Sequence, residues 1–246
     1  MISYKDRFLF IHVPRTGGTS IENFLQRHTA ALDELPRDEA LVEDLLRYQH
    51  LHAARAEKIF LEKKISFGGF FKFSFVRNPW EALVSFFFYD QYTLLNESPG
   101  ASHTVVFADY VRENIPPKES FSSTPKKSDV LFGLMGELSM GVKCHRFSPS
   151  FWLCDDDDNM LMDFVGRFEN LQQDFDLICD RIKIPRGGLS RLRACGDTDS
   201  CPWHKERGIH IPPYGLYTEY YNDESLQLAN DLFQKDADYF GYKFGE

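Results

Sequence analysis

The sequence predicts an α/β protein with a central, mostly parallel sheet flanked by helices. Three short apolar runs have the pattern of buried strands, and each precedes a segment in which apolar residues recur at helical spacing. Strands that alternate with helices favour parallel pairing, because parallel strands need a long crossover connection. With 43% hydrophobic and 15% aromatic residues, and with no repeat or separating linker, we expect a single domain over residues 1–246.

The first unit of this pattern is a strand, a glycine-rich turn and a helix. Residues 8–13, FLFIHV, form a short apolar run, and PRTGGTS follows at 14–20. In residues 21–28, IENFLQRH, the apolar positions fall at helical spacing. Pro36 breaks the chain, and from 38 to about 64 the helical pattern returns.

The second strand leads directly into a second helix. Residues 70–76, FFKFSFV, read as a buried strand that ends before Arg77. Asn78 is a helix-capping residue, Pro79 suits the first helical position, and Glu81 is the carboxylate of a capping box. A helix is therefore expected to begin as soon as this strand ends.

The rest of the chain contains a long loop and a third strand. Residues 92–129 are rich in Ser, Pro, Gly and Lys, and a loop of that length in a compact domain is more often a binding or lid element than scaffold. The acidic run Asp155–Asp158 reads as a solvated turn. Residues 162–168 predict a third strand, with helices expected at 171–182 and 226–240.

Charge and cysteine content narrow the class of protein. The net charge of −9 argues against a protein whose main task is to bind nucleic acid. Five scattered cysteines suit a reducing compartment, and whether Cys195 and Cys201 are bonded stays open. The longest mostly apolar stretch, 82–89, is too short to span a membrane, and the first residues lack a signal-peptide core. We expect a soluble, cytoplasmic chain without a structural metal; the sequence does not indicate its oligomeric state.

The turn at 14–20 has the form of an anion site. A glycine-rich turn between a strand and a helix directs successive backbone N–H groups and the positive end of the helix dipole toward one point. The nucleotide-triphosphatase version, G-x-x-x-x-G-K-[ST], is absent, because the glycines are adjacent and no lysine precedes Thr19 or Ser20. This turn instead has an arginine before its glycines and hydroxyl groups after them.

The second strand-to-helix junction carries similar groups. Arg77 stands at the end of the strand, and Ser85 follows eight residues later inside the capped helix. Ligands of open α/β sheets bind at the carboxyl ends of parallel strands. The two junctions are therefore expected to lie side by side there.

These motifs resemble those of the sulfotransferases that use 3′-phosphoadenosine 5′-phosphosulfate (PAPS). Within that family, the resemblance is to the carbohydrate-type, family 2-like branch. HVPRTGGTS is similar to the family's 5′-phosphosulfate loop, and FVRNPWEALVSFF to its 3′-phosphate motif. HRFSPSFWLC, MDFVGRFENL and the C-terminal helix are similar to further segments of that branch, so the resemblance covers nearly the whole chain. It implies a three-layer P-loop-like fold and transfer of a sulfuryl group from PAPS to a hydroxyl of a glycan or small molecule, leaving 3′-phosphoadenosine 5′-phosphate (PAP).

The resemblance also implies which residues hold the donor. The 3′-phosphate would be bound by Arg77 and Ser85, and a basic loop with Lys205 and Arg207 would close over the nucleotide. Arg15 would stabilise the charge on the leaving oxygen rather than donate a proton to it, since a guanidinium is a poor proton donor. No metal is needed. The 5′-phosphosulfate would be held by Arg15, Thr16, Gly17, Gly18, Thr19 and Ser20.

The acceptor hydroxyl needs a general base, and histidine has a suitable unperturbed pKa of ~6.5. His50 and His52 lie between the two motifs, where relatives carry an H-x-H element, and His52 matches the catalytic one better because Ala-Ala and a helical stretch follow it. Read without the family, both are half-exposed helix histidines. His145 and His204 are the next candidates for the base, followed by Glu22.

Two other functions compete with this interpretation. A P-loop nucleotide kinase or NTPase would share the strand, loop and helix, but this sequence lacks the lysine-containing motif of that class. A non-catalytic module could keep the nucleotide-binding fold without turnover. The acceptor would be set by residues 92–129 and 145–152, which carry no motif that identifies it. The charge of −9 favours a neutral or small acceptor over a highly sulfated polymer.

Overall fold

The computed structural model describes residues 1–28, 50–97, 106–119, 126–127, 144–190 and 214–246. Contacts between residues divide the chain into two compact units, each described here by itself. The first unit contains residues 1–77 and 124–190, and the second contains residues 78–123 and 191–246. The expectation of a single domain stays a prediction.

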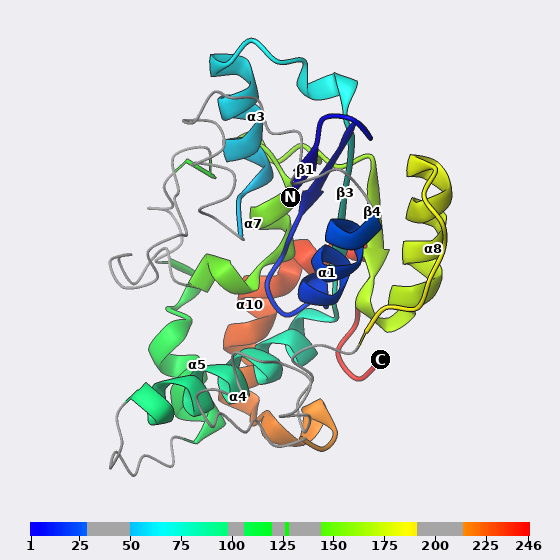
Figure 1. Cartoon of the computed structure of the whole chain (residues 1–246). Helices are drawn as coiled ribbons and strands as arrows, with labels where there is room; N and C mark the ends of the chain where they lie inside the picture. Colours follow the sequence, from blue (N-terminus) through cyan, green and yellow to red (C-terminus); the bar gives the residue numbers. More distant parts are fainter. Residues whose placement is uncertain (29–49, 98–105, 120–125, 128–143, 191–213) are drawn as a thin grey trace. The chain divides into compact units, whose positions relative to one another are not determined.

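The first unit is built on a four-stranded sheet of order β1-β2-β3-β4 (Figure 1). Strand β1 (Ile2–Ser3) pairs antiparallel with β2 (Phe8–Ile11), and β3 (Phe71–Val76) pairs parallel with both β2 and β4 (Phe164–Arg167). The parallel strands end at the same edge, where β2 leads to the glycine-rich turn and β3 leads to Arg77. The predicted α/β class with a mostly parallel sheet is confirmed.

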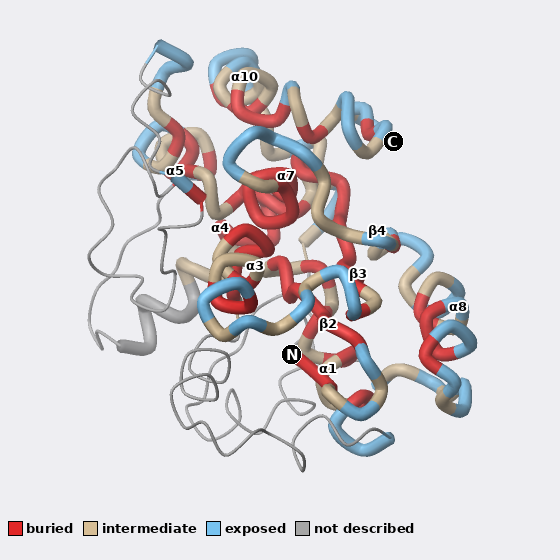
Figure 2. The backbone as a smooth tube through the Cα atoms, turned by 90° about the horizontal axis from the view of Figure 1, so that it is seen from above, coloured by how far each residue is buried: buried red, intermediate tan, exposed pale blue. Residues whose placement is uncertain are grey.

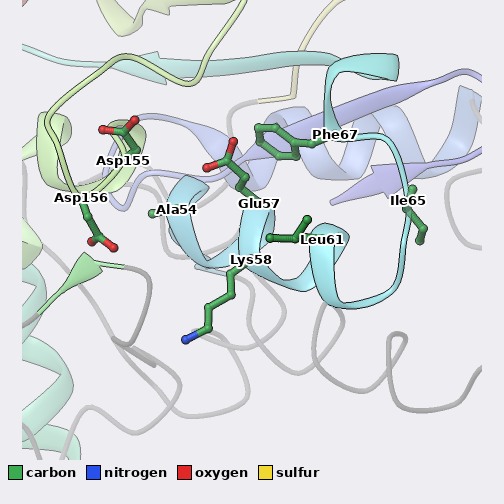
Figure 3. A pocket seen from close by; sticks show the side chains of 8 residues that line it. All are labelled: Ala54, Glu57, Lys58, Leu61, Ile65, Phe67, Asp155 and Asp156. Carbon is green, nitrogen blue, oxygen red and sulfur yellow. The ribbon is translucent and has the colours of Figure 1, made fainter.

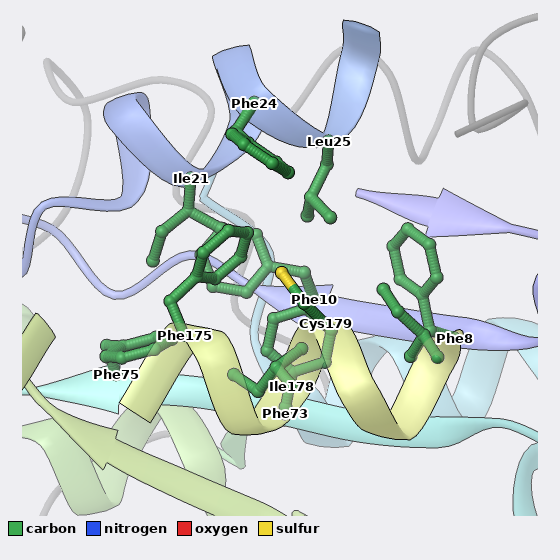
Figure 4. Close-up of a cluster of buried hydrophobic side chains, with 11 residues drawn as sticks. Phe8, Phe10, Ile21, Phe24, Leu25, Phe73, Phe75, Phe175, Ile178 and Cys179 are labelled. Atoms are coloured by element: carbon green, nitrogen blue, oxygen red, sulfur yellow. The ribbon is translucent and has the colours of Figure 1, made fainter. Parts of the chain in front are cut away.

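The sheet's first face is covered by α1 (Gly18–His28) and α8 (Leu171–Ile182). Alternate residues of β2 and β3 point to this face, as the two-residue period of a strand requires. Figure 4 shows these side chains converging with those of the two helices, and the Phe10 and Phe73 rings stack with centroids 5.1 Å apart. The cluster comprises Phe8, Phe10, Ile21, Phe24, Leu25, Phe73, Phe75, Phe175, Ile178, Cys179 and Ile182.

Two helices, α3 (Ala53–Glu62) and the short α7 (Pro149–Leu153), lie on the other side of the sheet (Figures 1 and 2). Both bury apolar residues toward it, and Trp152 of α7 is among the largest fully buried side chains. Helix, sheet and helix thus form the predicted three layers within this unit. Short 3₁₀ turns at 67–69, 144–147 and 168–170 complete it.

The second unit is helical where it is described. It contains α4 (Pro79–Glu97), α5 (Phe107–Asn114), a 3₁₀ turn at 217–220 and α10 (Asp223–Phe240). The Asn78 amide oxygen accepts from the N–H groups of Trp80 and Glu81, which confirms the predicted cap of α4. Asn222 and Ser225 form a capping box at α10.

The segment 92–129 differs from the expected loop. Helix α4 continues to Glu97, and α5 occupies 107–114. Phe107, Tyr110 and Val111 are buried at helical spacing, so their burial stabilises a helix whose periodicity is weak in the sequence. In the described part of the chain, no helix has the length and apolar content needed to cross a membrane.

Candidate functional site

The turn between β2 and α1 is held in shape by its own side chains and backbone. Arg15 and Gly17 adopt positive φ angles of 66° and 79°, in the left-handed region. The Thr16 hydroxyl is buried and donates to the Val13 carbonyl at 2.8 Å. That bond fixes the loop from within, so any ligand contact of Thr16 would come from its backbone N–H.

The N-terminus of α1 is suited to an anion. Its first turn, Gly18–Ile21, carries no acidic residue, whereas Arg27 and His28 lie in the last turn. The Ser20 and Ile21 N–H groups donate to the Gly17 carbonyl at 3.0 and 3.4 Å, and the positive end of the helix dipole faces the loop with no carboxylate in the first turn to neutralise it. Ser20 is largely buried and Thr19 is half-buried at this end.

Both glycines of the turn are required by close packing. A methyl group at Gly18 would overlap the imidazole of His12, with the His12 Cγ only 2.6 Å from the added carbon. A methyl at Gly17 would lie 2.9 Å from Leu171 Cδ2 and 3.3 Å from two ring carbons of Phe168. Carbon atoms prefer separations of about 3.5–4.0 Å, so neither position has room for a side chain.

Arg77 lies against this turn. The residue is 8% exposed, and its Nη1 donates a long hydrogen bond of 3.4 Å to the carbonyl of Arg15. Its Cζ stands 4.3 Å from the centre of the Phe168 ring, which is a cation–π contact. The two arginine-bearing motifs are therefore brought together, as expected from their places at the carboxyl ends of neighbouring parallel strands.

His50 reaches the same end of β2. Its Nδ1 lies 2.9 Å from the carbonyl oxygen of His12, and the two rings are 4.4 Å apart. A carbonyl can only accept, so Nδ1 carries a proton, and in the neutral ring Nε2 then presents a lone pair. His12 itself is buried, and its Nδ1 lies 3.1 Å from a Glu22 carboxylate oxygen.

His52 occupies a different environment. It caps the start of α3, is 1% exposed, and stacks on the Trp152 ring with centroids 4.2 Å apart. Its Nδ1 donates to the Phe151 carbonyl at 3.0 Å, which again leaves the lone pair on Nε2. Burial lowers the pKa of His52 to about 3, with Lys127 and His145 adding to the effect and the Phe151 hydrogen bond opposing it. The expected half-exposed helix histidine is instead a buried neutral one.

Lys127 joins the end of the predicted loop to the acidic turn. Its ammonium donates to the Asp155 carbonyl at 2.7 Å and pairs with the Asp158 carboxylate. Burial, with a smaller contribution from the charge of Lys127, lowers the pKa of His145 to about 4. His145 stacks on Phe151, so it belongs to the aromatic packing around His52.

The remaining predicted residues fall elsewhere. Ser85 is a buried residue of α4 in the second unit. Lys205, Arg207 and His204 lie outside the described residues. Within the described ranges, no group of three or more His, Cys, Asp or Glu side chains could hold a metal ion.

A cavity of about 410 Å³ lies on the outward side of α3 (Figure 3). Phe67 and Ile65, which line it, precede β3, so they stand at the amino end of the parallel strands. The turn and Arg77 stand at the carboxyl end. This cavity is therefore separate from the arginine-bearing turn; it is lined by Ala54, Glu57, Lys58, Leu61, Ile65, Phe67, Asp155 and Asp156.

Comparison with protein-family models matches residues 1–243 to the sulfotransferase family, in its family 2 branch. The chain belongs to the sulfotransferase family. Neither the curated proteins nor the solved structures gave a match. The family match covers both arginine-bearing motifs and agrees with the α/β fold and the P-loop-like turn.

Several residues of this sulfotransferase that shape the turn were not predicted as site residues. His12 was taken only as part of the apolar run FLFIHV, yet a polar side chain at the second-last position of that run, just before the glycine-rich turn, is a signal that could have identified it. Phe168 ends the predicted third strand, and Trp152 lies in the segment 145–152 that was expected to help set the acceptor. Their contacts with Arg77 and His52 depend on tertiary packing, which the sequence pattern does not show.

Proposed function

We propose that this sulfotransferase moves a sulfuryl group from PAPS to a hydroxyl group of a carbohydrate or small molecule. The observation that carries the proposal is the contact of Arg77 with the Arg15 carbonyl, which joins two anion-binding motifs at one edge of the sheet. PAPS carries two anionic groups, the 5′-phosphosulfate and the 3′-phosphate. A turn rich in N–H groups beside a second arginine matches that pair of charges.

Residues Arg15 to Ser20 would bind the 5′-phosphosulfate, with the side chain of Arg15 and backbone N–H groups of the turn as donors; the Ser20 N–H itself already donates to the Gly17 carbonyl. In the transfer, the acceptor oxygen forms a bond to sulfur while the bond from sulfur to the 5′-phosphate oxygen breaks. Negative charge then grows on that phosphate oxygen, and Arg15 would stabilise it. Arg77 and Ser85 would bind the 3′-phosphate, with Lys205 and Arg207 as further contacts.

His52 is the proposed general base, taking the acceptor proton on Nε2. Its hydrogen bond to Phe151 supports this role because it fixes the tautomer with the lone pair on that nitrogen. A pKa of about 3 keeps the ring neutral at pH 7, but it also makes the ring a weak base. His50 has the same tautomer and lies beside the turn, so the two histidines must be compared directly.

The first experiment is nucleotide binding by the wild-type protein, measured by thermal shift and calorimetry. PAP should stabilise the protein more than ATP with magnesium does. Arg77→Ala should weaken PAP binding by at least roughly 10- to 150-fold, the loss expected for one hydrogen bond to a charged group. Arg181→Ala, which removes an arginine from α8, is the matched control and should bind normally. A preference for ATP would contradict the proposal.

The second experiment separates binding from turnover. His52→Ala should bind PAP normally and lose roughly 10²- to 10⁴-fold in turnover, the usual contribution of a general base. His50→Ala is measured beside it. If His50→Ala has the larger loss and His52→Ala turns over normally, the base is His50.

The acceptor is proposed from charge alone. An acidic chain would repel a highly sulfated polymer, so neutral glycans and small hydroxyl compounds come first in a screen with labelled donor. Preferred transfer to a polyanionic polymer would overturn this part of the proposal.

A further inference from the structure

One aromatic ring touches both halves of the proposed donor site. Strand β4 pairs with β3 so that Arg167 lies opposite Val76. Arg77 is the first residue after β3, and Phe168 is the first residue after β4. The register therefore places the Phe168 ring beside the Arg77 guanidinium, 4.3 Å from ring centre to Cζ.

The same ring also reaches the glycine-rich turn. Two of its carbons would stand 3.3 Å from a methyl group on Gly17, and Leu171 would be closer still at 2.9 Å. Gly17 has a φ of 79°, so its backbone shape is one that other residues rarely adopt. Phe168 and Leu171 together form a wall against which the turn rests.

Stacking orients a guanidinium without using its hydrogen-bond donors. The cation lies over the ring face, while its N–H groups point outward in the guanidinium plane. For Arg77, one of these N–H groups donates to the Arg15 carbonyl through a long bond of 3.4 Å. The ring face supplies a further restraint, which acts on the plane of the guanidinium.

We propose that Phe168 is a positioning residue that sets the place of Arg77 relative to the turn, and thereby the selectivity for a nucleotide with a 3′-phosphate. This inference rests on the proposed function, because it assigns the 3′-phosphate to Arg77. A displacement of about 1 Å in a positioning group can cost on the order of 100-fold in rate, so a restraint on Arg77 has a measurable effect.

The test compares binding of PAP with binding of 5′-AMP, which lacks the 3′-phosphate. Phe168→Leu keeps an apolar side chain but removes the ring face, and Phe168→Tyr keeps the face. Phe168→Leu should weaken PAP binding roughly 2- to 30-fold, the range of a cation–π contact, and leave AMP binding nearly unchanged. The ratio of the two dissociation constants should fall accordingly, and Phe168→Tyr should restore it.

Phe71→Leu is the matched control. Phe71 lies under Arg181 with 5.6 Å from ring centre to Cζ, so this variant removes a cation–π ring from the same unit, away from the turn. It should leave the PAP-to-AMP ratio unchanged. In the Arg77→Ala background, Phe168→Leu should have no further effect on the ratio of the two dissociation constants. This double-mutant comparison tests the inference even if Phe168→Leu by itself lowers the stability of the protein.

The outcomes separate the inference from the function on which it rests. A wild-type protein that binds AMP as tightly as PAP refutes the 3′-phosphate site, and with it both proposals. A wild-type preference for PAP that Phe168→Leu leaves intact overturns the role of Phe168 alone. Equal weakening of PAP and AMP by Phe168→Leu also overturns it, since that is the result of a general loss of packing.

Discussion

Replacement of Gly18 by alanine tests whether the glycine-rich turn at residues 14–20 and the side chain of His12 are packed as one unit. The added methyl group would overlap the His12 imidazole, whose Cγ would be 2.6 Å away. The ring cannot move freely, because it is buried, stacked on Phe10, and in contact with His50. The clash must therefore displace either the imidazole or the first turn of α1.

The expected cost follows from two opposing effects. Overpacking in a tightly packed site costs about 1–3 kcal/mol, and replacing glycine in a helix returns about 0.5–1 kcal/mol. The added carbon would stand only 2.1 Å from His12 Cδ2, so the overpacking cost lies in the upper half of that range, about 2–3 kcal/mol, and the net destabilisation should be about 1–2.5 kcal/mol. For a chain of this length, that lowers the melting temperature by roughly 2–10 °C.

The assay is thermal unfolding of four proteins: wild type, Gly18→Ala, His12→Ala and the double variant. In the His12→Ala background the methyl group has room, so Gly18→Ala should cost no more than a few tenths of a kcal/mol there. Gly68→Ala is the control, since nothing lies within 4 Å of its added carbon. An equal cost of Gly18→Ala in both backgrounds would refute the clash with His12.

Three further predictions concern stability. Thr16→Val removes the buried hydroxyl that donates to the Val13 carbonyl and should cost about 1–3 kcal/mol in chemical denaturation, whereas Thr16→Ser should keep most of the stability. Asn78→Ala removes the cap of α4 and should cost about 1 kcal/mol by the same measurement; an unchanged midpoint would exclude that cap as a stabilising contact. The pKa of His52 is lowered from 6.5 to about 3, so the unfolded chain binds a proton that the folded chain does not, and stability should fall as pH drops from about 6.5 toward 3. His52→Gln should reduce this slope by up to about 1.4 kcal/mol per pH unit, and denaturation midpoints between pH 4.5 and 7 measure it. His145 and the Met1 ammonium, whose pKa values burial also lowers, contribute further slope in the same direction.

The backbone of the site could be predicted from the sequence because its signals are local. The apolar run at residues 8–13, the adjacent glycines and the Asn-Pro cap each act within a few residues, and each defines a strand end or helix start. Placing Arg15 near Arg77 needed one more rule, that parallel strands end at one edge of a sheet. The structure brings these two residues together accordingly.

The environment of the histidines could not be predicted in this way. His50 and His52 are two residues apart and look alike in the sequence, but their surroundings are set by different distant segments. His52 is enclosed by Phe151 and Trp152, about one hundred residues away, whereas His50 is bound to the end of β2. Burial, and hence the pKa, depends on this long-range packing.

The acidic charge of the chain does not conflict with an anion site, because the two act over different distances. Exposed charges separated by more than about 8–10 Å are largely screened at physiological salt. The turn offers N–H groups and a helix dipole that act within one turn of α1, with Arg77 held beside them and largely shielded from water. A buried guanidinium is screened much less than an exposed one, so a few fixed groups at close range can outweigh a net charge of −9 spread over the whole chain. Affinity for the proposed anionic donor should therefore depend on how well these groups are positioned, and hence on the packing of His12 and Phe168 around the turn.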